Sequence, residues 1–406
     1  MRIPPRLSRQ VLLPRGFRFA GTAAGIKGKG ALDLGLAEAL PPGGAAAALF
    51  TSNRVLAAPL RVGRRHLQAG RGRVLALIVN SGNANCATGA AGRRACERIC
   101  ARLARWLRAT TKQIFPSSTG VIGVALPTDR ILSALPRLLA GRQATRAGLV
   151  RFARAIMTTD TRIKLAAVRF RCGRGQGTLL GVAKGAGMIH PRLATMLVYL
   201  FTDVAARPAE LRRLLAAACA RSFNRISVDG DTSTNDTVLL LASGASGERM
   251  RPGAAQRSFA AALEAVCGSL ARQIVADGEG VRHVIQLRVE GARSLAEAER
   301  VARAIAHSPL VKTAWAGADP NWGRILAAAG ASGVSLDPAR VDIFLGPQQV
   351  CRRGVACPFN ERRAHRYLSR GEYEVRVRLG RGRAATTLWT GDLTADYVRI
   401  NAHYRS

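Results

Sequence analysis

Four segments of the chain combine small residues with hydroxyl, amide or charged side chains, the mixture that a catalytic pocket needs. They read PSSTGVIG at residues 116–123, MTTDT at 157–161, KGAGMIHPRLATML at 184–197 and DGDTSTNDT at 229–237. Glycine lets backbone N–H groups approach a ligand closely, and hydroxyl groups beside it can donate to a developing negative charge. The same residue types also close turns and cap helices, so each segment taken alone is equally open to a structural interpretation.

The motifs of several common enzyme classes do not occur in the sequence. Residues 25–30 have the glycines of a phosphate-binding loop, but they continue with Ala31 and Leu32 where a Walker motif requires Lys and Ser or Thr. There is no GxSxG serine motif, and the eight cysteines and six histidines show no CxxC, HxxxH or HExxH spacing. We therefore expect no nucleotide chemistry, no metal site and no cofactor.

Local hydrophobic patterns predict helices and strands interleaved along the chain. Helical spacing of apolar residues occurs at 90–107, 208–220, 254–276 and 294–307, and the last of these begins with Ser294 and Glu297 at capping-box spacing. Strands are predicted at 73–79, 282–289, 341–345 and 373–379, and a hairpin turn at the glycines of 173–177. The interleaving predicts an α/β or α+β fold with layered packing.

The high positive charge has two interpretations. Lys and Arg number 62 against 25 Asp and Glu, which gives a net charge of +37. Clustered positive charge binds phosphates, so an arginine-rich RNA-binding protein is one interpretation. The arginines are scattered through every segment without a dense block, however, and no aromatic platform motif accompanies them. This distribution favours solvent-facing arginines, and we expect no specific nucleic-acid partner.

Length and composition indicate a folded protein outside the membrane. A chain of 406 residues can bury a sizeable core, and no apolar run approaches the ~20 residues of a membrane-spanning helix. The basic N-terminus lacks the apolar stretch of a secretory signal. Cysteines without disulfide-like spacing are typical of a reducing compartment. We therefore expect a cytoplasmic protein.

A series of short segments, in one order along nearly the whole chain, resembles the ArgJ family of ornithine acetyltransferases. Besides KGAGMIHPRLATML, they are AAGIKGKG at 23–30, IVNSGNAN at 78–85, PSSTGVIG at 116–123, AIMTTDT at 155–161, STNDTVLLLASG at 233–244, DGEGV at 277–281 and DPNWGRILAA at 319–328. The resemblance implies bifunctional glutamate N-acetyltransferases of arginine biosynthesis. These would move acetyl from N2-acetylornithine to L-glutamate, with acetyl-CoA as a further candidate donor.

The resemblance also implies a fold and a processing step. The fold would be an αββα sandwich of the kind found in DmpA-like proteins. Self-cleavage between Ala194 and Thr195 would give an α chain of residues 1–194 and a β chain of residues 195–406, assembled as α2β2. His190 stands where the family commonly has a small residue, and we expect it to affect the cleavage rate.

Site residues follow from the same resemblance. Thr195 would be the nucleophile, and the Thr119 hydroxyl with the Gly120 N–H would form the oxyanion hole. The substrate-binding set would be Thr158, Lys184, Thr195, Glu279, Asn401 and Ser406.

Elementary chemistry explains why self-cleavage would activate such a threonine. A threonine hydroxyl is a poor nucleophile without a base to accept its proton. Cleavage before Thr195 would free an α-amino group with a pKa near ~7.7–8.0, and a nearby Lys184 would lower that pKa further. The alternative that shares this nucleophile is a self-cleaving amidohydrolase or aminopeptidase, in which water takes the acyl group.

Overall fold

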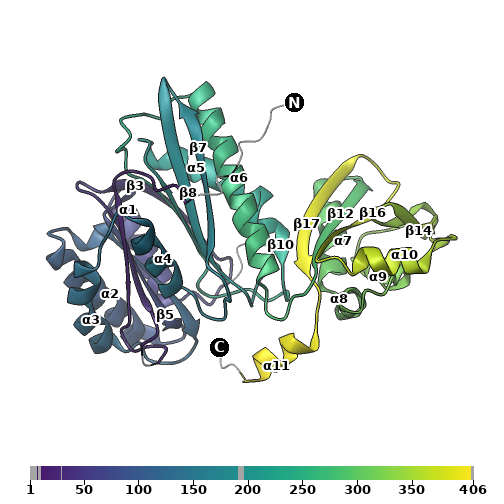
Figure 1. Ribbon diagram of the computed structural model, residues 1–406, viewed down its shortest axis with the longest axis horizontal. Helices are drawn as coiled ribbons and strands as arrows, with labels where there is room; N and C mark the ends of the chain where they lie inside the picture. The colour runs from purple at the N-terminus through teal and green to yellow at the C-terminus, as the bar shows by residue number, and fades with distance from the viewer. Residues whose placement is uncertain (1–6, 8–10, 29, 191–195, 404–406) are drawn as a thin grey trace.

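The structure, a computed structural model, describes residues 7, 11–28, 30–190 and 196–403. Figure 1 shows two bodies side by side: a larger one that holds the purple to green part of the chain, and a smaller yellow-green one formed by its C-terminal part. Ala194, Thr195 and Ser406 lie outside the described residues.

Two mixed sheets build the larger body. The first has the order β1 (Phe17–Thr22), β2 (Leu34–Ala39), β5 (Ala76–Asn83), β6 (Ile114–Val121). The second has the order β4 (Arg73–Val74), β3 (Gly44–Phe50), β11 (Thr237–Ala242), β9 (Leu197–Thr202), β8 (Gly175–Lys184), β7 (Lys164–Cys172). Helices of this body are α1 (Ala58–Ala69), α2 (Gly89–Trp106), α3 (Thr128–Ala140), α4 (Arg146–Ala155), α5 (Pro208–Arg221) and α6 (Ala254–Ala276).

Alternate residues of the central strands enter different hydrophobic cores, and this alternation defines the layers. In β5, Leu77 and Val79 pack with Phe201 of the other sheet, whereas Ala76 and Ile78 pack under α2 and α3. In β11, residues at odd positions likewise face the first sheet, and those at even positions lie under α5 and α6. Strands buried on both faces are apolar throughout because neither face meets water. The layers therefore run helices, sheet, sheet, helices, which confirms the predicted αββα sandwich.

Helix α6 shows how closely the outer layer packs. It lies along β7 and β8 (Figure 1), and Gly181 of β8 faces it, where a Cβ atom would come within 2.5 Å of Leu270 Cδ1. Within the described residues α6 is the one helix long and apolar enough to cross a membrane. Its nine buried residues, among them Leu263, Leu270 and Ile274, belong to the core beneath it, so α6 is a core helix.

The C-terminal body is a separate sheet with helices against one face. The sheet order is β10 (Ile226–Ser227), β17 (Ala384–Gly391), β12 (Val284–Ala292), β16 (Glu372–Arg378), β13 (Asp342–Leu345), β14 (Gln348–Arg352), β15 (Val355–Ala356). Its helices are α7 (Leu295–His307), α8 (Pro309–Ala316), α9 (Trp322–Gly330) and α10 (Glu361–Leu368). The last helix, α11 (Ala395–His403), leaves this body and reaches back below the gap between the two (Figure 1).

Most predicted elements are present with small shifts at their ends, but the strand predicted at 73–79 divides at Leu75 into β4 and β5, which belong to different sheets. The helix predicted at 254–276 matches α6, the hairpin turn at 173–177 joins β7 to β8, and Ser294 caps α7 by accepting from Glu297 N. The capping box is completed differently from the prediction, because the Glu297 carboxylate accepts from the N–H of Arg293. The predicted cut would fall between β8 and β9, which are neighbours in one sheet. Both pieces would therefore share the sandwich core.

Candidate active site

The ends of four strands meet at one edge of the sandwich, and the candidate residues lie there. Lys184 ends β8 and pairs with Leu197 at the start of β9, which also pairs with Thr237 at the start of β11. Thr119 and Gly120 lie near the end of β6 in the facing sheet. A cavity of about 160 Å³ opens at this edge. Its lining comprises Ala84, Thr119, Gly120, Ile122, Thr158, Thr159, Lys184, Gly187, Met188, Asp229, Asp231, Ser233, Thr234, Asn235, Glu279, Tyr397 and Asn401.

The Thr119–Gly120 pair occupies an irregular stretch of backbone. The pairing of β5 with β6 shifts register at Gly82 and Asn83, opposite this pair. Gly120 has φ +130°, and a Cβ atom on it would lie 2.3 Å from the Gly82 carbonyl carbon. Only glycine fits this conformation and this close approach. At this bulge the buried Thr119 and the glycine beside it line the cavity, and these are residue types that an oxyanion hole uses.

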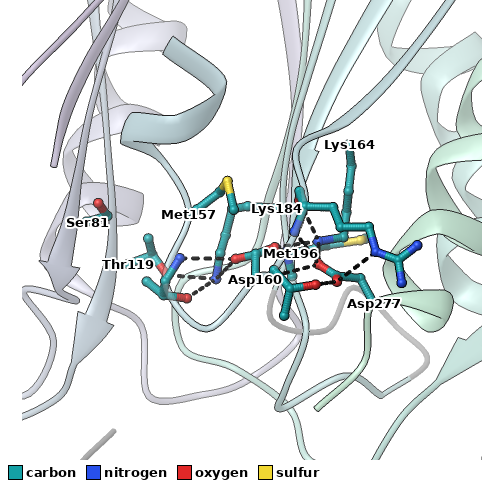
Figure 2. Close-up of polar contacts among 12 residues, drawn as sticks. Ser81, Thr119, Met157, Asp160, Lys164, Lys184, Met196 and Asp277 are labelled. Atoms are coloured by element: carbon teal, nitrogen blue, oxygen red, sulfur yellow. Dashed lines mark hydrogen bonds and ion pairs between the residues drawn. The ribbon is translucent and has the colours of Figure 1, made fainter. Parts of the chain in front are cut away.

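Lys184 is the buried cation of the cavity, with 2% of its surface exposed. Its Nζ donates to Thr158 Oγ1 at 2.8 Å and to Thr119 Oγ1 at 3.4 Å, and lies 3.9 Å from Asp160 Oδ2. Asp160 in turn accepts the Thr158 N–H at 3.0 Å and the Gly185 N–H at 2.6 Å. Figure 2 shows this group between the two sheets. The ammonium therefore joins the predicted oxyanion residue to a predicted substrate residue.

A second buried lysine forms an ion pair with Asp160, through the carboxylate oxygen that does not face Lys184. Lys164 Nζ contacts Asp160 Oδ1 at 2.7 Å and Asp277 Oδ2 at 2.5 Å (Figure 2). Asp277 also accepts a hydrogen bond from the Thr161 hydroxyl and one from its N–H. Two lysines and two carboxylates thus alternate in the order Lys184, Asp160, Lys164, Asp277. The sequence assigned no role to Asp160, Lys164 or Asp277. Asp160 and Lys164 are only four positions apart, but Lys164 and Asp277 are 113 positions apart, and a pair so distant leaves no local pattern.

Burial and the alternation of positive and negative charges determine the pKa values of Asp160 and Lys184. Burial alone would raise the pKa of Asp160, but Lys184 and Lys164 outweigh it and lower the pKa from 3.8 to about 2. Burial lowers the pKa of Lys184, and Asp160 acts against that fall. Asp160 is therefore the group that keeps an ammonium at position 184 in a site from which water is largely excluded.

Replacing Asp160 by asparagine is expected to weaken both the fold and the charge of Lys184. Because the folded pKa of Asp160 lies below its ordinary value of 3.8, its stabilisation is present above pH 3.8 and lost as pH falls towards about 2. At pH 7 the unfolding free energy of Asp160→Asn should fall by about 3–5 kcal/mol. Without Asp160 the pKa of Lys184 falls further. The alkaline limb of the pH–activity profile should therefore shift to lower pH.

Denaturant unfolding and a pH profile of kcat/KM measure these two effects. The matched control is Asp129→Asn, which removes an exposed carboxylate that pairs with Arg98 on the surface. The control should reproduce the wild-type profile. An unchanged alkaline limb in a folded Asp160→Asn enzyme would show that Asp160 does not act on Lys184.

Glu279 and Asn401 form the opposite half of the predicted substrate set, and the structure brings them together. Asn401 Nδ2 donates to Glu279 Oε2 at 2.9 Å, and Glu279 N donates to Ala186 O at 2.9 Å. Gly187 makes room for this carboxylate, because a Cβ atom there would lie 2.4 Å from Glu279 Cδ. Helix α11 thereby closes the cavity with residues from the end of the chain.

The cavity also holds residues that the sequence did not assign. Asp229, Asp231 and Tyr397 line it, so it contains three carboxyl groups with Glu279 against the single ammonium of Lys184. Burial raises the pKa of Asp229 to about 6. Tyr397 could have been found from its spacing, since it precedes Asn401 by one helical turn, and Asn401 Nδ2 also donates to the Tyr397 carbonyl.

The predicted set is thus brought together as far as it is described. Thr119, Gly120, Thr158, Lys184, Glu279 and Asn401 all line one cavity. Ala194, Thr195 and Ser406 fall outside the described residues, so their roles stay predictions. Ser233, Thr234 and Asn235, from the segment 229–237 singled out in the sequence, lie in the cavity wall itself. Within the described part of the chain, no group of three or more His, Cys, Asp or Glu side chains is placed to hold a metal ion.

Comparison with known proteins gives a consistent result. The family model described as "ArgJ family" matches residues 18–406. The arginine biosynthesis bifunctional protein ArgJ of Chlorobaculum tepidum is 43% identical over 98% of this chain and 97% of its own length, and that of Symbiobacterium thermophilum is 46% identical over 98% of each. The ornithine acetyltransferase of Mycobacterium tuberculosis, solved as a complex with ornithine, is 39% identical over 46% of this chain and 97% of the solved chain, with a TM-score of 0.42.

Proposed function

This chain belongs to the ArgJ family and is an acetyltransferase of arginine biosynthesis, and from that premise we propose that it moves acetyl from N2-acetylornithine to L-glutamate through an ester on Thr195. One observation carries the proposal. Residues on both sides of position 195 line a single cavity that contains a buried ammonium, a carboxylate and a hydroxyl beside a glycine. This is the set of groups that an amino-acid substrate and an acyl-transfer oxyanion require.

Activation begins with cleavage between Ala194 and Thr195 into residues 1–194 and 195–406. In the precursor the nitrogen of Thr195 is an amide and cannot accept a proton. After cleavage it is an α-amine with an ordinary pKa near ~7.7–8.0, and a positive charge on the nearby Lys184 lowers that pKa. Thr195 then carries its own base.

The first half of the reaction releases ornithine. The Thr195 hydroxyl attacks the acetyl carbonyl of N2-acetylornithine and passes its proton to its own α-amine. Thr119 and Gly120 stabilise the oxyanion. As the carbon–nitrogen bond breaks, the α-amine returns the proton to the leaving nitrogen, which leaves the acetyl ester of Thr195 and free ornithine.

The second half uses glutamate as the acceptor. The amine of glutamate attacks the ester carbonyl and loses a proton, and Thr195 Oγ1 leaves as a hydroxyl. The products are N-acetylglutamate and the free enzyme. Both substrates carry an α-carboxylate, which Lys184 can bind. Glu279, with Asn401, can bind the δ-ammonium of ornithine, and Thr158, Thr195 and Ser406 complete the proposed binding set.

The substrates separate this reaction from hydrolysis. After the first acetyl group per site, a transferase should release ornithine from N2-acetylornithine only when glutamate is present, and each further ornithine should appear with one N-acetylglutamate. We expect omission of glutamate to stop turnover after one acetyl group per site, measured by mass spectrometry of both products. A self-cleaving amidohydrolase or aminopeptidase would continue with water and release acetate, and that outcome would overturn the acetyltransferase assignment.

Several further properties belong to the proposal. The enzyme needs no cofactor, and acetyl-CoA in place of N2-acetylornithine tests whether a second donor is used. We also expect an α2β2 assembly of four pieces, a cytoplasmic location and no specific nucleic-acid partner. The pairing of β8 with β9 supports only the association of one α piece with one β piece, since the two could not separate without breaking the core.

A further inference from the structure

One loop contacts the chain on both sides of residues 191–195. This loop runs from Ser227 to Thr237, between β10 and β11, and carries the half-buried Asp229 and the buried Asp236. Asp229 accepts the N–H of Met188 at 2.5 Å on Oδ2 and that of Ile189 at 2.8 Å on Oδ1. Asp236 Oδ1 accepts the N–H of Met196 at 2.9 Å. Each carboxyl group therefore holds one flank of the segment that contains the proposed cleavage bond.

The carbonyl groups of the same flanks are held as well. Ile189 O accepts from Val228 N at 2.9 Å and from the Ser227 hydroxyl at 3.2 Å. Met196 O accepts from Thr237 N at 3.2 Å. Both the donor and the acceptor of each flanking residue are thus paired with the loop, which fixes position and orientation together.

The loop is itself anchored in the sandwich. Asn235 Nδ2 donates to Ala84 O at 2.7 Å and to Ser118 O at 2.9 Å, which connects the loop to the facing sheet. Thr51 donates its hydroxyl to Ser233 O at 2.8 Å and its N–H to Asp236 O at 3.1 Å. Asp236 is 1% exposed. A loop fixed at so many points can hold both flanks of residues 191–195 in one geometry.

We propose that this loop is a clamp for self-cleavage, in which Asp229 positions the flank before the cleavage bond and Asp236 positions the flank after it. The inference rests on the cleavage proposed above. Met196 N belongs to the peptide unit that begins at the carbonyl of Thr195, and this unit is planar. Fixing its N–H therefore restricts the position from which Thr195 can attack the Ala194 carbonyl.

The step that the clamp assists is an acyl shift followed by hydrolysis. The Thr195 oxygen bonds to the Ala194 carbonyl carbon, the carbon–nitrogen bond breaks, and the hydroxyl proton moves to the nitrogen to give an amine. Water then adds to the ester. The carbon–oxygen bond to Thr195 breaks, Ala194 becomes a carboxylate, and Thr195 regains its hydroxyl. Asp229 and Asp236 act here as positioning residues, because the contacts that they make to the two flanks are to backbone N–H groups.

The two carboxyl groups differ in how many oxygens they use, and this difference gives a sharp test. Asp236 uses Oδ1 for Met196, so asparagine retains the needed acceptor. Asp229 uses both oxygens for the flank, so asparagine loses one of them. In freshly synthesised full-length protein followed by intact mass, we expect Asp236→Asn to cleave within about threefold of wild type. Asp236→Leu, Asp229→Leu and Asp229→Asn should each be slowed at least tenfold.

The matched control is Asp203→Leu. Asp203 is also buried and accepts two backbone N–H groups, from Thr178 and Arg15, but does not contact either flank. It should cleave at the wild-type rate, with folding checked by thermal unfolding. If Asp236→Leu fails to fold, the cleavage rates of Asp236→Asn and Asp229→Asn decide by themselves. The clamp is overturned if the two rates are equal or if Asp229→Asn cleaves faster than Asp236→Asn. Slowing of Asp236→Asn to the level of Asp236→Leu would overturn positioning in favour of proton transfer. An uncleaved wild type would instead contradict the proposed function.

Discussion

Replacement of Thr195 by alanine is expected to leave one chain of 43.1 kDa and to abolish acetyl transfer. The reason is that a single residue would supply both the nucleophile and, once cleaved, the base. Alanine removes the hydroxyl that breaks the Ala194–Thr195 bond, and so the α-amine never forms. Because groups that act as one unit fail together, we expect a loss of at least about 10⁴-fold in kcat.

Intact mass under denaturing conditions, on wild type beside Thr195→Ala, measures the first part of this prediction. Wild type should give two fragments whose masses meet at Ala194 and Thr195, while the variant stays whole. Thr195→Ser is the matched control, since serine keeps both the hydroxyl and the future α-amine, and it should still cleave and transfer acetyl. A wild-type protein that remains one chain would remove the proposed base and favour the RNA-binding interpretation. Binding with a steep salt dependence would then be the next measurement.

Elements with strong local patterns were predicted well, and their arrangement was predicted only through the family resemblance. Helix α6 and the strand at β16 follow from periodicity, because one buried face forces apolar residues to recur at the spacing of the element. The insertion of β9 and β11 between β8 and β3 has no local signal. That order arises from pairing between segments far apart in the sequence. The separate C-terminal sheet was missed for the same reason.

Some residues of the candidate site could also be predicted from the sequence, and others only from the structure. Thr119, Lys184 and Glu279 stand in segments that match the family's motifs, so the resemblance could assign them, and the structure places them around one cavity. Lys164 and Asp277 sit in ordinary strand and helix-end sequence. They become a buried ion pair only because β7 and the end of α6 pack together, with 113 positions between them in the chain. Charge partners of this kind require the tertiary structure.

The clamp loop could be predicted in part from the sequence. Its residues were singled out for their polar composition, but the sequence assigned no role in the site to Asp229, Asp231 or Ser233, which line the cavity. Asx and hydroxyl side chains in a loop bond nearby backbone whether or not a substrate is present. Composition therefore predicts that such a loop is rigid, and only the fold shows which segment it holds.

Replacing Thr119 by valine is expected to lower kcat for acetyl transfer by about 10²–10³-fold, with a smaller change in KM. Valine keeps the shape of threonine and removes the hydroxyl, so the transition-state oxyanion would retain only the Gly120 N–H. Loss of one such donor costs about 2.7–4 kcal/mol of transition-state stabilisation. The effect should fall on kcat because the negative charge develops only as the tetrahedral intermediate forms.

The geometry at Thr119 also supplies the control for this prediction. Its hydroxyl accepts a hydrogen bond from Lys184 Nζ at 3.4 Å, which leaves the hydroxyl proton free to be donated into the cavity. Thr119→Ser keeps that arrangement and should stay within about tenfold of wild type. Steady-state kinetics with N2-acetylornithine and glutamate, on protein shown by intact mass to be cleaved, separates the chemical step from processing. If Thr119→Val raised KM and left kcat unchanged, Thr119 would bind the substrate and not the oxyanion.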